Sequence, residues 1–157
     1  MNDDSLSIAK QVFQFEIEAL EKTIQGLDGN FTKAVQLILN HTGKVVLCGM
    51  GKSGHIAKKI VATFNSTGTP AVFLHPAEGV HGDLGIYSPG DPTLLFSKSG
   101  ATEEILRLIP QLKKFHSPLI ACVTNLNSPI AKEADIVLQA AITHEADPLK
   151  IVPTAST

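Results

Sequence analysis

The sequence has 157 residues, a length that suits a single folded domain. Its 43% hydrophobic and 18% charged residues are typical of a globular protein with a core, which excludes a disordered or fibrous chain. The net charge is −2 and no long basic run is present, so nucleic acid and an anionic membrane are poor candidates for a partner. The sequence has no signal-peptide pattern and no apolar run long enough to cross a membrane, so we expect a cytoplasmic protein.

The first two predicted elements are helices. Between residues 7 and 25 the apolar residues recur with a helical period, which predicts a long amphipathic helix with a wide buried face. Asn30 is expected to cap a second helix that runs to about residue 41, just before Gly43.

After these helices the pattern changes to short apolar runs separated by helical stretches. Unbroken apolar strands that alternate with helices predict an α/β fold with a parallel sheet covered on both faces. The predicted strands are 44–48, 71–75, 93–96, 119–123 and 136–138, and the helices between them are 54–66, 101–115 and 129–134. In such a sheet, ligands bind where strands end and helices begin, so the loops after the strands are the places to look for chemistry.

The first strand is followed by a glycine-rich loop, Gly49-Met50-Gly51-Lys52-Ser53-Gly54. The loop matches the G-x-G-x-x-G pattern of dinucleotide-binding proteins, but the second strand ends in His75-Pro76, where such a site needs an acidic residue. A Walker loop would need glycine in place of Val46. We interpret the loop as a turn that lets the backbone approach a ligand, with Lys52 supplying a positive charge. A tight turn with a solvated lysine is the alternative.

The third strand is followed by a loop rich in hydroxyl groups, which contains Ser97, Ser99, Gly100 and Thr102 and runs into a helix. Hydroxyls and free backbone N–H groups at a helix N-terminus can cradle a phosphate. The same residues could equally cap the helix, with its early glutamates stabilising the helix dipole.

Six motifs in this order resemble the sugar isomerase (SIS) family, and within it the arabinose-5-phosphate isomerases. The resemblance covers nearly everything from the first glycine loop to the end of the sequence. The motifs are Gly49-Met50-Gly51-Lys52-Ser53-Gly54, Ser66-Thr67-Gly68-Thr69-Pro70, His75-Pro76-Ala77-Glu78, His81-Gly82-Asp83-Leu84-Gly85, Ser97-x-Ser99-Gly100-x-Thr102-x-Glu104 and Pro153-Thr154-Ala155-Ser156-Thr157.

The resemblance implies the SIS fold, a three-layer αβα sandwich with a five-stranded parallel sheet, here preceded by two N-terminal helices. It implies interconversion of D-ribulose 5-phosphate and D-arabinose 5-phosphate through an enediolate, the first step toward the eight-carbon acidic sugar (Kdo) of lipopolysaccharide. It also implies a homo-oligomer, a dimer or tetramer, with sites near subunit contacts, and no metal or organic cofactor. Two other functions stay open: a sugar-phosphate-binding regulatory module without turnover, and an SIS isomerase that acts on a hexulose phosphate.

The resemblance also assigns site residues. The active-site positions fall on Lys52, His81, Glu104 and Glu145, and the substrate and phosphate contacts fall on Gly51, Ser53, Gly54, Ser97, Ser99, Gly100 and Thr102. Either glutamate is the expected proton shuttle, His81 would serve ring opening or contact a hydroxyl, and Lys52 would steady the oxyanion or the phosphate. The structural alternatives are a helix-dipole carboxylate for Glu104, a solvated loop charge for Glu145 and a turn-bracing side chain for His81.

Two further expectations concern a metal and the extent of the domain. His75, His81 and Asp83 could converge on a metal such as zinc, although their H-x5-H-x-D spacing is not diagnostic. In the family, the loop that contains Thr157 leads into another helix, and a pair of CBS modules usually follows. We therefore expect residues 1–157 to be a single SIS domain, truncated at its C-terminal end and without CBS modules.

Overall fold

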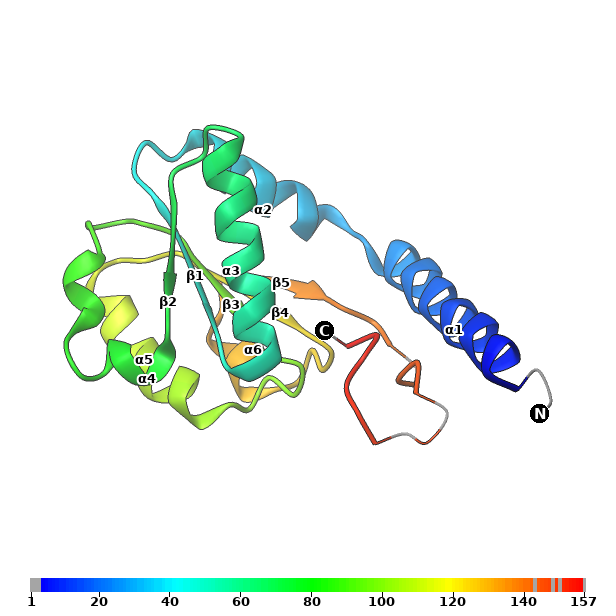
Figure 1. Ribbon diagram of the computed structural model, residues 1–157. Coiled ribbons are helices and arrows are strands. Elements are labelled where there is room, and N and C mark those ends of the chain that lie inside the picture. The colour runs from blue at the N-terminus through cyan, green and yellow to red at the C-terminus, as the bar shows by residue number, and fades with distance from the viewer. Residues whose placement is uncertain (1–3, 143, 148, 150, 157) are drawn as a thin grey trace.

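A computed structural model of the chain describes residues 4–142, 144–147, 149 and 151–156 (Figure 1). The sheet consists of β1 (Val45–Gly49), β2 (Ala71–Leu74), β3 (Thr93–Phe96), β4 (Leu119–Val123) and β5 (Ile136–Gln139). The helices are α1 (Asp4–Gly26), α2 (Gly29–Asn40), α3 (Gly51–Ser66), α4 (Pro76–Gly79), α5 (Glu103–Lys114) and α6 (Pro129–Glu133), with a short 3₁₀ helix, η1 (Asp83–Ile86). Within the described residues, none of the helices is both long and apolar enough to span a membrane.

The five strands form one all-parallel sheet in the order β2-β1-β3-β4-β5. This confirms the predicted α/β fold with a five-stranded parallel sheet, and each strand lies within one residue of its predicted range. After β1 the chain moves to one side of that strand to form β2, and β3 then pairs with β1 on the other side. The loops after β1 and β3 therefore diverge at a switch point, where open α/β sheets form crevices for ligands.

Helices cover both faces of the sheet, so the fold has three layers (Figure 1). On one face, Leu47 of β1 packs in a cluster with Ala57 of α3, and α2 joins the same layer. On the other face, Leu95 of β3 packs in a cluster with Leu108 of α5, and α6 joins that layer. Adjacent strand residues point to opposite faces, so continuous apolar runs are the expected pattern for strands buried on both sides.

The helix starts differ from the predictions in ways that local hydrogen bonding explains. Asp28, rather than Asn30, is the N-cap of α2, because its carboxylate accepts a hydrogen bond of 2.8 Å from the Asn30 N–H. The helix after β1 begins at Gly51 instead of residue 54, so most of the glycine loop is already its first turn. Ser128 is the N-cap of α6, where its hydroxyl accepts a hydrogen bond of 3.4 Å from the Ala131 N–H.

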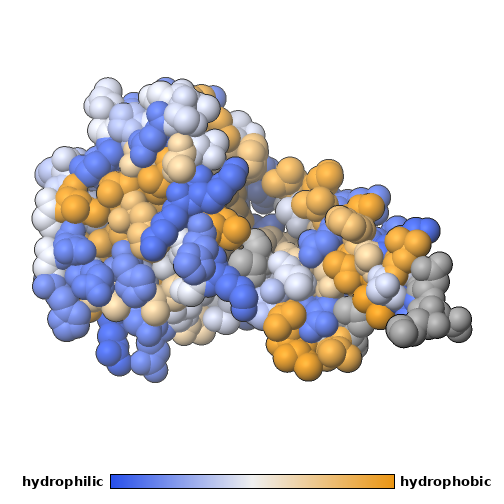
Figure 2. All heavy atoms as spheres, in the orientation of Figure 1, coloured by the Kyte–Doolittle hydropathy of each residue, from blue (hydrophilic) through white to orange (hydrophobic). Residues whose placement is uncertain are grey.

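The first helix, α1, lacks the wide buried face that its periodicity predicts. Ala19 is its one buried residue, whereas Phe13, Leu20 and Ile24 are 70%, 64% and 65% exposed. Figure 1 shows the reason: α1 projects from the αβα sandwich, where no second layer covers its apolar stripe. Hydrophobic residues gather on this projecting part of the surface (Figure 2). The prediction of a buried face is wrong for a single chain.

A buried carboxylate lies at the edge of the sheet where the strands begin. Asp91, which precedes β3, accepts hydrogen bonds from Lys44 Nζ at 2.5 Å and from the Ser88 N–H at 2.8 Å, and His41 Nε2 lies 2.9 Å from its other oxygen. Burial alone would raise the pKa of Asp91, but the hydrogen bonds from Lys44, Ser88 and His41 outweigh it and lower the pKa to about 2. Asp91 therefore ties the end of α2 and the start of β1 to β3.

Candidate active site

The glycine loop after β1 brings the strand and α3 into close contact. A Cβ added to Gly54 would lie 2.7 Å from the Gly49 carbonyl oxygen, so a side chain there would push the helix away from the strand. This close approach aims the first turn of α3, with Lys52 and Ser53, at the space above the ends of the strands. Because the first N–H groups of a helix have no intrahelical partner, this turn can attract an anion.

The loop after β3 is organised by its own hydroxyl groups. Ser97 is buried, and its Oγ lies 2.8 Å from Thr102 Oγ1 and accepts a hydrogen bond of 3.1 Å from the Gly100 N–H. Gly100 has a φ of +65°, and a Cβ there would lie 2.0 Å from Ser128 Oγ, so only glycine fits. The serine loop, residues 97–102, therefore has one defined conformation at the N-terminus of α5.

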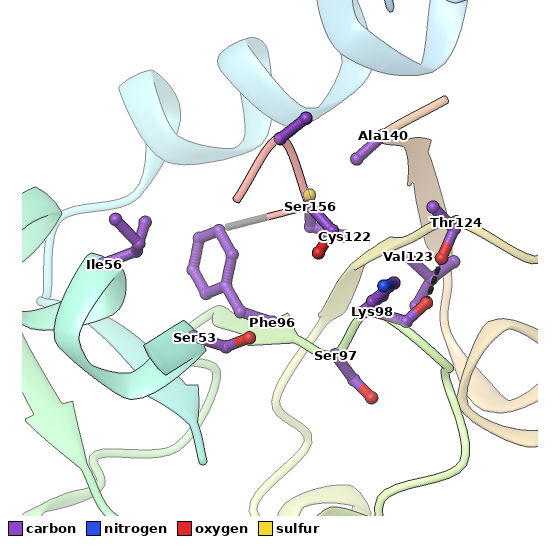
Figure 3. Close-up of a pocket in the computed structure, with 11 residues that line it drawn as sticks. Ser53, Ile56, Phe96, Ser97, Lys98, Cys122, Val123, Thr124, Ala140 and Ser156 are labelled. Atoms are coloured by element: carbon purple, nitrogen blue, oxygen red, sulfur yellow. Dashed lines mark hydrogen bonds between the residues drawn. The ribbon is translucent and has the colours of Figure 1, made fainter. Parts of the chain in front are cut away.

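Two adjoining cavities lie between the glycine loop and the serine loop, and Figure 3 shows the smaller of them. Their volumes are about 170 Å³ and about 240 Å³, and Ser53, Lys98 and Ser156 line both of them. Ser97 and Cys122 line the smaller one and Lys52 lines the larger one. The space thus combines hydroxyl groups with two lysine side chains, a combination suited to a phosphorylated polar ligand.

The structure brings together only some of the predicted site residues. Lys52, Ser53 and Ser97 line these two cavities, whereas Gly51 and Gly54 line a separate cavity of about 180 Å³ with His75. The other predicted residues do not line the first two cavities: Ser99, Gly100, Thr102, His81, Glu104 and Glu145.

Several of these outlying residues have local structural partners. Ser99 Oγ accepts a hydrogen bond of 3.2 Å from the Ala101 N–H, and Thr102 is bonded to Ser97 within the loop. Glu104 lies in the first turn of α5, where a carboxylate stabilises the helix dipole. His81 is exposed, and its backbone N–H donates 2.9 Å to the Glu78 carbonyl at the end of α4.

Glu145 is the most heavily bonded carboxylate near the cavities. It forms an ion pair with Lys98. Its oxygens also accept hydrogen bonds from the Thr154 N–H at 2.8 Å, from the Ser156 N–H at 3.2 Å and from the hydroxyl groups of both residues. Its side chain is only 14% exposed, so the alternative of a solvated loop charge is wrong. Burial raises the pKa of Glu145, but hydrogen bonds from Lys98, Ser156 and Thr154 outweigh that effect and lower the pKa to about 2.

Sequence reasoning did not select Lys98 or Cys122 as site residues. Lys98 stands at a position of the serine motif that carried no assigned role, and its one signal was its place between two predicted contacts, Ser97 and Ser99. Cys122 lies within the apolar run of β4, one residue before its end, and looks like a core residue, yet it lines the smaller cavity. Burial raises the pKa of its thiol, so the group is neutral near pH 7.

The structure does not bring His75, His81 and Asp83 together as a metal site. Among the residues that the structure describes, which include all three, no group of three or more His, Cys, Asp and Glu side chains could hold a metal ion. The physical reason is their placement: His75 ends β2, whereas α4 separates it from His81 and from η1, where Asp83 lies.

Comparisons with known proteins support the resemblance to the SIS family, both in sequence and in structure. The family model described as the SIS domain matches residues 38–157. Arabinose 5-phosphate isomerase KpsF of Escherichia coli O6:H1 is 46% identical over 97% of this chain and 47% of its own length, and KdsD of Pseudomonas aeruginosa is 44% identical over 99% of the chain and 48% of its own length. The chain thus spans about half the length of these curated relatives.

A solved structure of an Escherichia coli CFT073 protein in complex with arabinose 5-phosphate superimposes with a TM-score of 0.93. It is 39% identical, and the match covers 99% of this chain and 84% of that one. The parallel sheet, the two loops at its switch point and the match to the family model over most of the sequence lead to one conclusion: this chain belongs to the SIS domain family.

Proposed function

We propose that this chain is a sugar-phosphate isomerase domain that interconverts D-ribulose 5-phosphate and D-arabinose 5-phosphate. The observation that carries the proposal is the match, at a TM-score of 0.93 and 39% identity, to a protein in complex with arabinose 5-phosphate. Relatives named arabinose 5-phosphate isomerase, at 44% to 46% identity over nearly the whole chain, point to the same substrate.

The proposed reaction moves one proton between neighbouring carbons. A base removes a proton from C1 of the open-chain ketose, and the C2 carbonyl oxygen takes the negative charge of an enediolate. The proton returns to C2 while the proton of the C1 hydroxyl passes to the C2 oxygen, so that C1 becomes the aldehyde and the aldose forms. The protein must supply a base, a positive charge near the developing oxyanion and a site for the phosphate.

The cavities supply two of these needs directly. The first turn of α3 and the hydroxyls of Ser53 and Ser97 would hold the phosphate, because helix N-termini and neutral donors favour an anion. Lys52, which lines the larger cavity, would stabilise the oxyanion.

We assign proton transfer to Glu104 rather than to Glu145. A carboxylate with a pKa of about 2 that already accepts hydrogen bonds from Lys98, Thr154 and Ser156 is a weak base, so Glu145 is suited to positioning. Glu104 follows the serine loop and has no such set of bonds among the described residues. His81 keeps the proposed role of ring opening.

A D₂O experiment tests the function and the assignment together. Incubation of the chain with ribulose 5-phosphate in D₂O should produce arabinose 5-phosphate with deuterium at C2, visible by NMR. Glu104→Gln should slow the incorporation by about 10² or more, because a general base contributes roughly that factor. Glu103→Gln is the matched control, since the Glu103 side chain is 77% exposed and pairs with Arg107 on the surface.

Two results would decide against this proposal. If ligand binds but neither product nor deuterium forms, the chain is a sugar-phosphate-binding module without turnover. If a hexulose phosphate exchanges faster than the pentose phosphate, the substrate assignment is wrong.

We further propose that the chain forms a homo-oligomer through α1. The exposed residues Phe13, Ile17, Leu20 and Ile24 of α1 follow one another at intervals of four, three and four residues. This spacing is that of the contact positions of a coiled coil, in which the apolar seam of one helix packs against another helix. A second copy of α1 would supply such a seam.

A further inference from the structure

The contact between Lys98 and Glu145 joins two parts of the chain that are far apart in sequence. Lys98 belongs to the serine loop after β3, whereas Glu145 follows β5, 47 residues later. Among the described residues, this is the one ion pair that links the serine loop to the chain after β5. The serine loop and the segment that lines the other side of the cavity are therefore connected by a single pair of charges.

The backbone of Lys98 is anchored independently of this ion pair. Its carbonyl oxygen accepts a hydrogen bond of 3.1 Å from the Thr124 N–H and a second one from the Thr124 hydroxyl (Figure 3). Thr124 directly follows β4, so the sheet itself determines where the lysine side chain starts. Lys98 thus offers its charge from a defined position at the cavity.

Glu145 in turn holds the last described part of the chain, residues 151–156, which we call the terminal segment. The Thr154 and Ser156 N–H groups donate to one of its oxygens at 2.8 Å and 3.2 Å. The terminal segment contributes Pro153, Ala155 and Ser156 to the cavity walls. In Figure 3, Ser156 faces the cavity from this segment, opposite the side formed by Ser53 and Ser97.

The charge of Lys98 makes this arrangement favourable. A largely buried carboxylate without a cation is costly, because its lost hydration must be replaced. Four neutral donors from Thr154 and Ser156 replace part of that hydration, and Lys98 supplies the only ionic partner among the described residues. Neutralising Lys98 should therefore weaken all the bonds that converge on Glu145.

We infer that Lys98 is a positioning residue that, through Glu145, holds the terminal segment as one wall of the cavity at the β1–β3 switch point. The inference does not depend on the proposed isomerase activity, because it concerns how the cavity is formed. It predicts that the cavity loses that wall when Lys98 loses its charge, even though the serine loop keeps its own hydrogen bonds.

NMR of the Thr154 and Ser156 amides tests the inference, because their chemical shifts report the ionisation of the carboxylate to which they donate. In the parent chain these shifts should stay constant down to about pH 3.5, since the Glu145 pKa is about 2. In Lys98→Met they should titrate above about pH 3.5, and both amides should exchange with solvent at least about tenfold faster, as expected for weakened bonds to a charged group. Lys98→Arg, which keeps the charge, should restore both properties.

Control variants separate this role from a general effect of charge or of misfolding. Lys113→Met removes the exposed ion pair with Glu133, at 2.5 Å, and should leave the two amides unchanged. The other titratable groups that line the two cavities are Lys52 and Cys122, and Lys52→Met should shift the titration less than Lys98→Met. Unchanged amide shifts in β3 and β4 would show that Lys98→Met is folded.

A double-mutant cycle completes the experiment. Glu145→Gln should release the same two amides, and the exchange rates of the double variant Lys98→Met/Glu145→Gln should match those of the single variants, because both changes break one link. The inference is overturned if Lys98→Met leaves the titration and the exchange rates at parent values, or if the two changes act additively.

Discussion

At the scale of single residues, two ionised carboxylates hold opposite edges of the sheet. Asp91 ties segments together where the strands begin, and Glu145 gathers donors near the cavity where the strands end. Hydrogen bonds outweigh burial in both cases, which lowers both pKa values to about 2. Each residue is therefore a source of stability that depends on pH.

Asp91 carries the clearest prediction for stability. Its pKa is lowered in the folded state from an ordinary value of 3.8 to about 2, so its contribution is complete above about pH 4 and is lost as the pH falls toward 2. Asp91→Asn should reduce the free energy of unfolding by about 3 kcal/mol at pH 7, because Lys44 and His41 lose their anionic partner. The deficit should shrink on acidification.

Urea denaturation from pH 7 to pH 3 measures both effects. Glu133→Gln, which removes an exposed pair with Lys113, should change the stability by less than about 1 kcal/mol and serves as the control. Equal effects of the two substitutions would contradict the role given to Asp91.

Gly100 provides a test of the serine loop. Gly100→Ala combines a left-handed backbone, with φ at +65°, and a Cβ that would collide with Ser128, so it should cost about 2 kcal/mol or more. Gly85→Ala, at an exposed glycine with no atom within 4 Å of the added Cβ, should change stability by about 0.5 kcal/mol at most. Thermal denaturation of both variants checks the difference.

At the scale of elements, buried strands were the most predictable part of the chain. Each consists of four or five mostly apolar residues, because helices cover both faces of the sheet and leave few positions for polar side chains. The short α4 and η1 escaped prediction, because elements of four residues contain too little of a helical period to recognise. The cap at Asp28 was missed because Asp28 and Asn30 are both good N-cap residues and only the geometry distinguishes them.

The candidate site was less predictable than the fold, because part of it depends on contacts between residues far apart in the sequence. Residue types and motif order pointed to Lys52, Ser53 and Ser97. These residues come shortly after β1 and β3, and all three line the cavities. The partners of Glu145 lie within a hydrogen-bonded cluster whose geometry no local pattern encodes. Lys98 is an example, since its contact with Glu145 spans 47 residues.

The helix α5 contains Pro110 and continues four residues beyond it, to Lys114. Proline leaves the Leu106 carbonyl without its intrahelical donor, and in a helix interior it costs about 3 kcal/mol relative to alanine. Pro110→Ala should stabilise the protein by about 1 to 2 kcal/mol. The gain is smaller than the helix cost of proline because proline also restricts the unfolded chain, and little packing is lost because Pro110 is exposed.

Chemical denaturation measures the gain from Pro110→Ala against Lys114→Ala, an exposed position on the same helix that should change by about 0.5 kcal/mol at most. A loss of stability in Pro110→Ala would show that the proline ring is part of the packing of α5.

At the scale of the whole molecule, α1 sets the expected assembly. It projects from the sandwich with an apolar stripe that the single chain does not cover (Figures 1 and 2). Sedimentation velocity of the parent chain should give a dimer or tetramer, and Leu20→Glu/Ile24→Glu should give a monomer with an intact sheet, because buried charges in a helix seam are costly. Lys22→Glu, an exposed charge change on the same helix, should keep the parent assembly.

A parent chain that stays monomeric at every concentration would contradict the role of α1. The folded monomer that we expect of the double variant would show that the αβα sandwich does not need a partner to form.

The pairing of β1 with β3 has a consequence for how this protein acquires its structure. It brings Val46 beside Thr93 across a crossover that includes α3 and β2, and such distant contacts form slowly because the intervening chain must first be ordered. Both loops that border the cavities depend on this contact, so a half-formed sheet has nowhere to hold a sugar phosphate. Added ligand should therefore slow unfolding and leave the rate of folding unchanged.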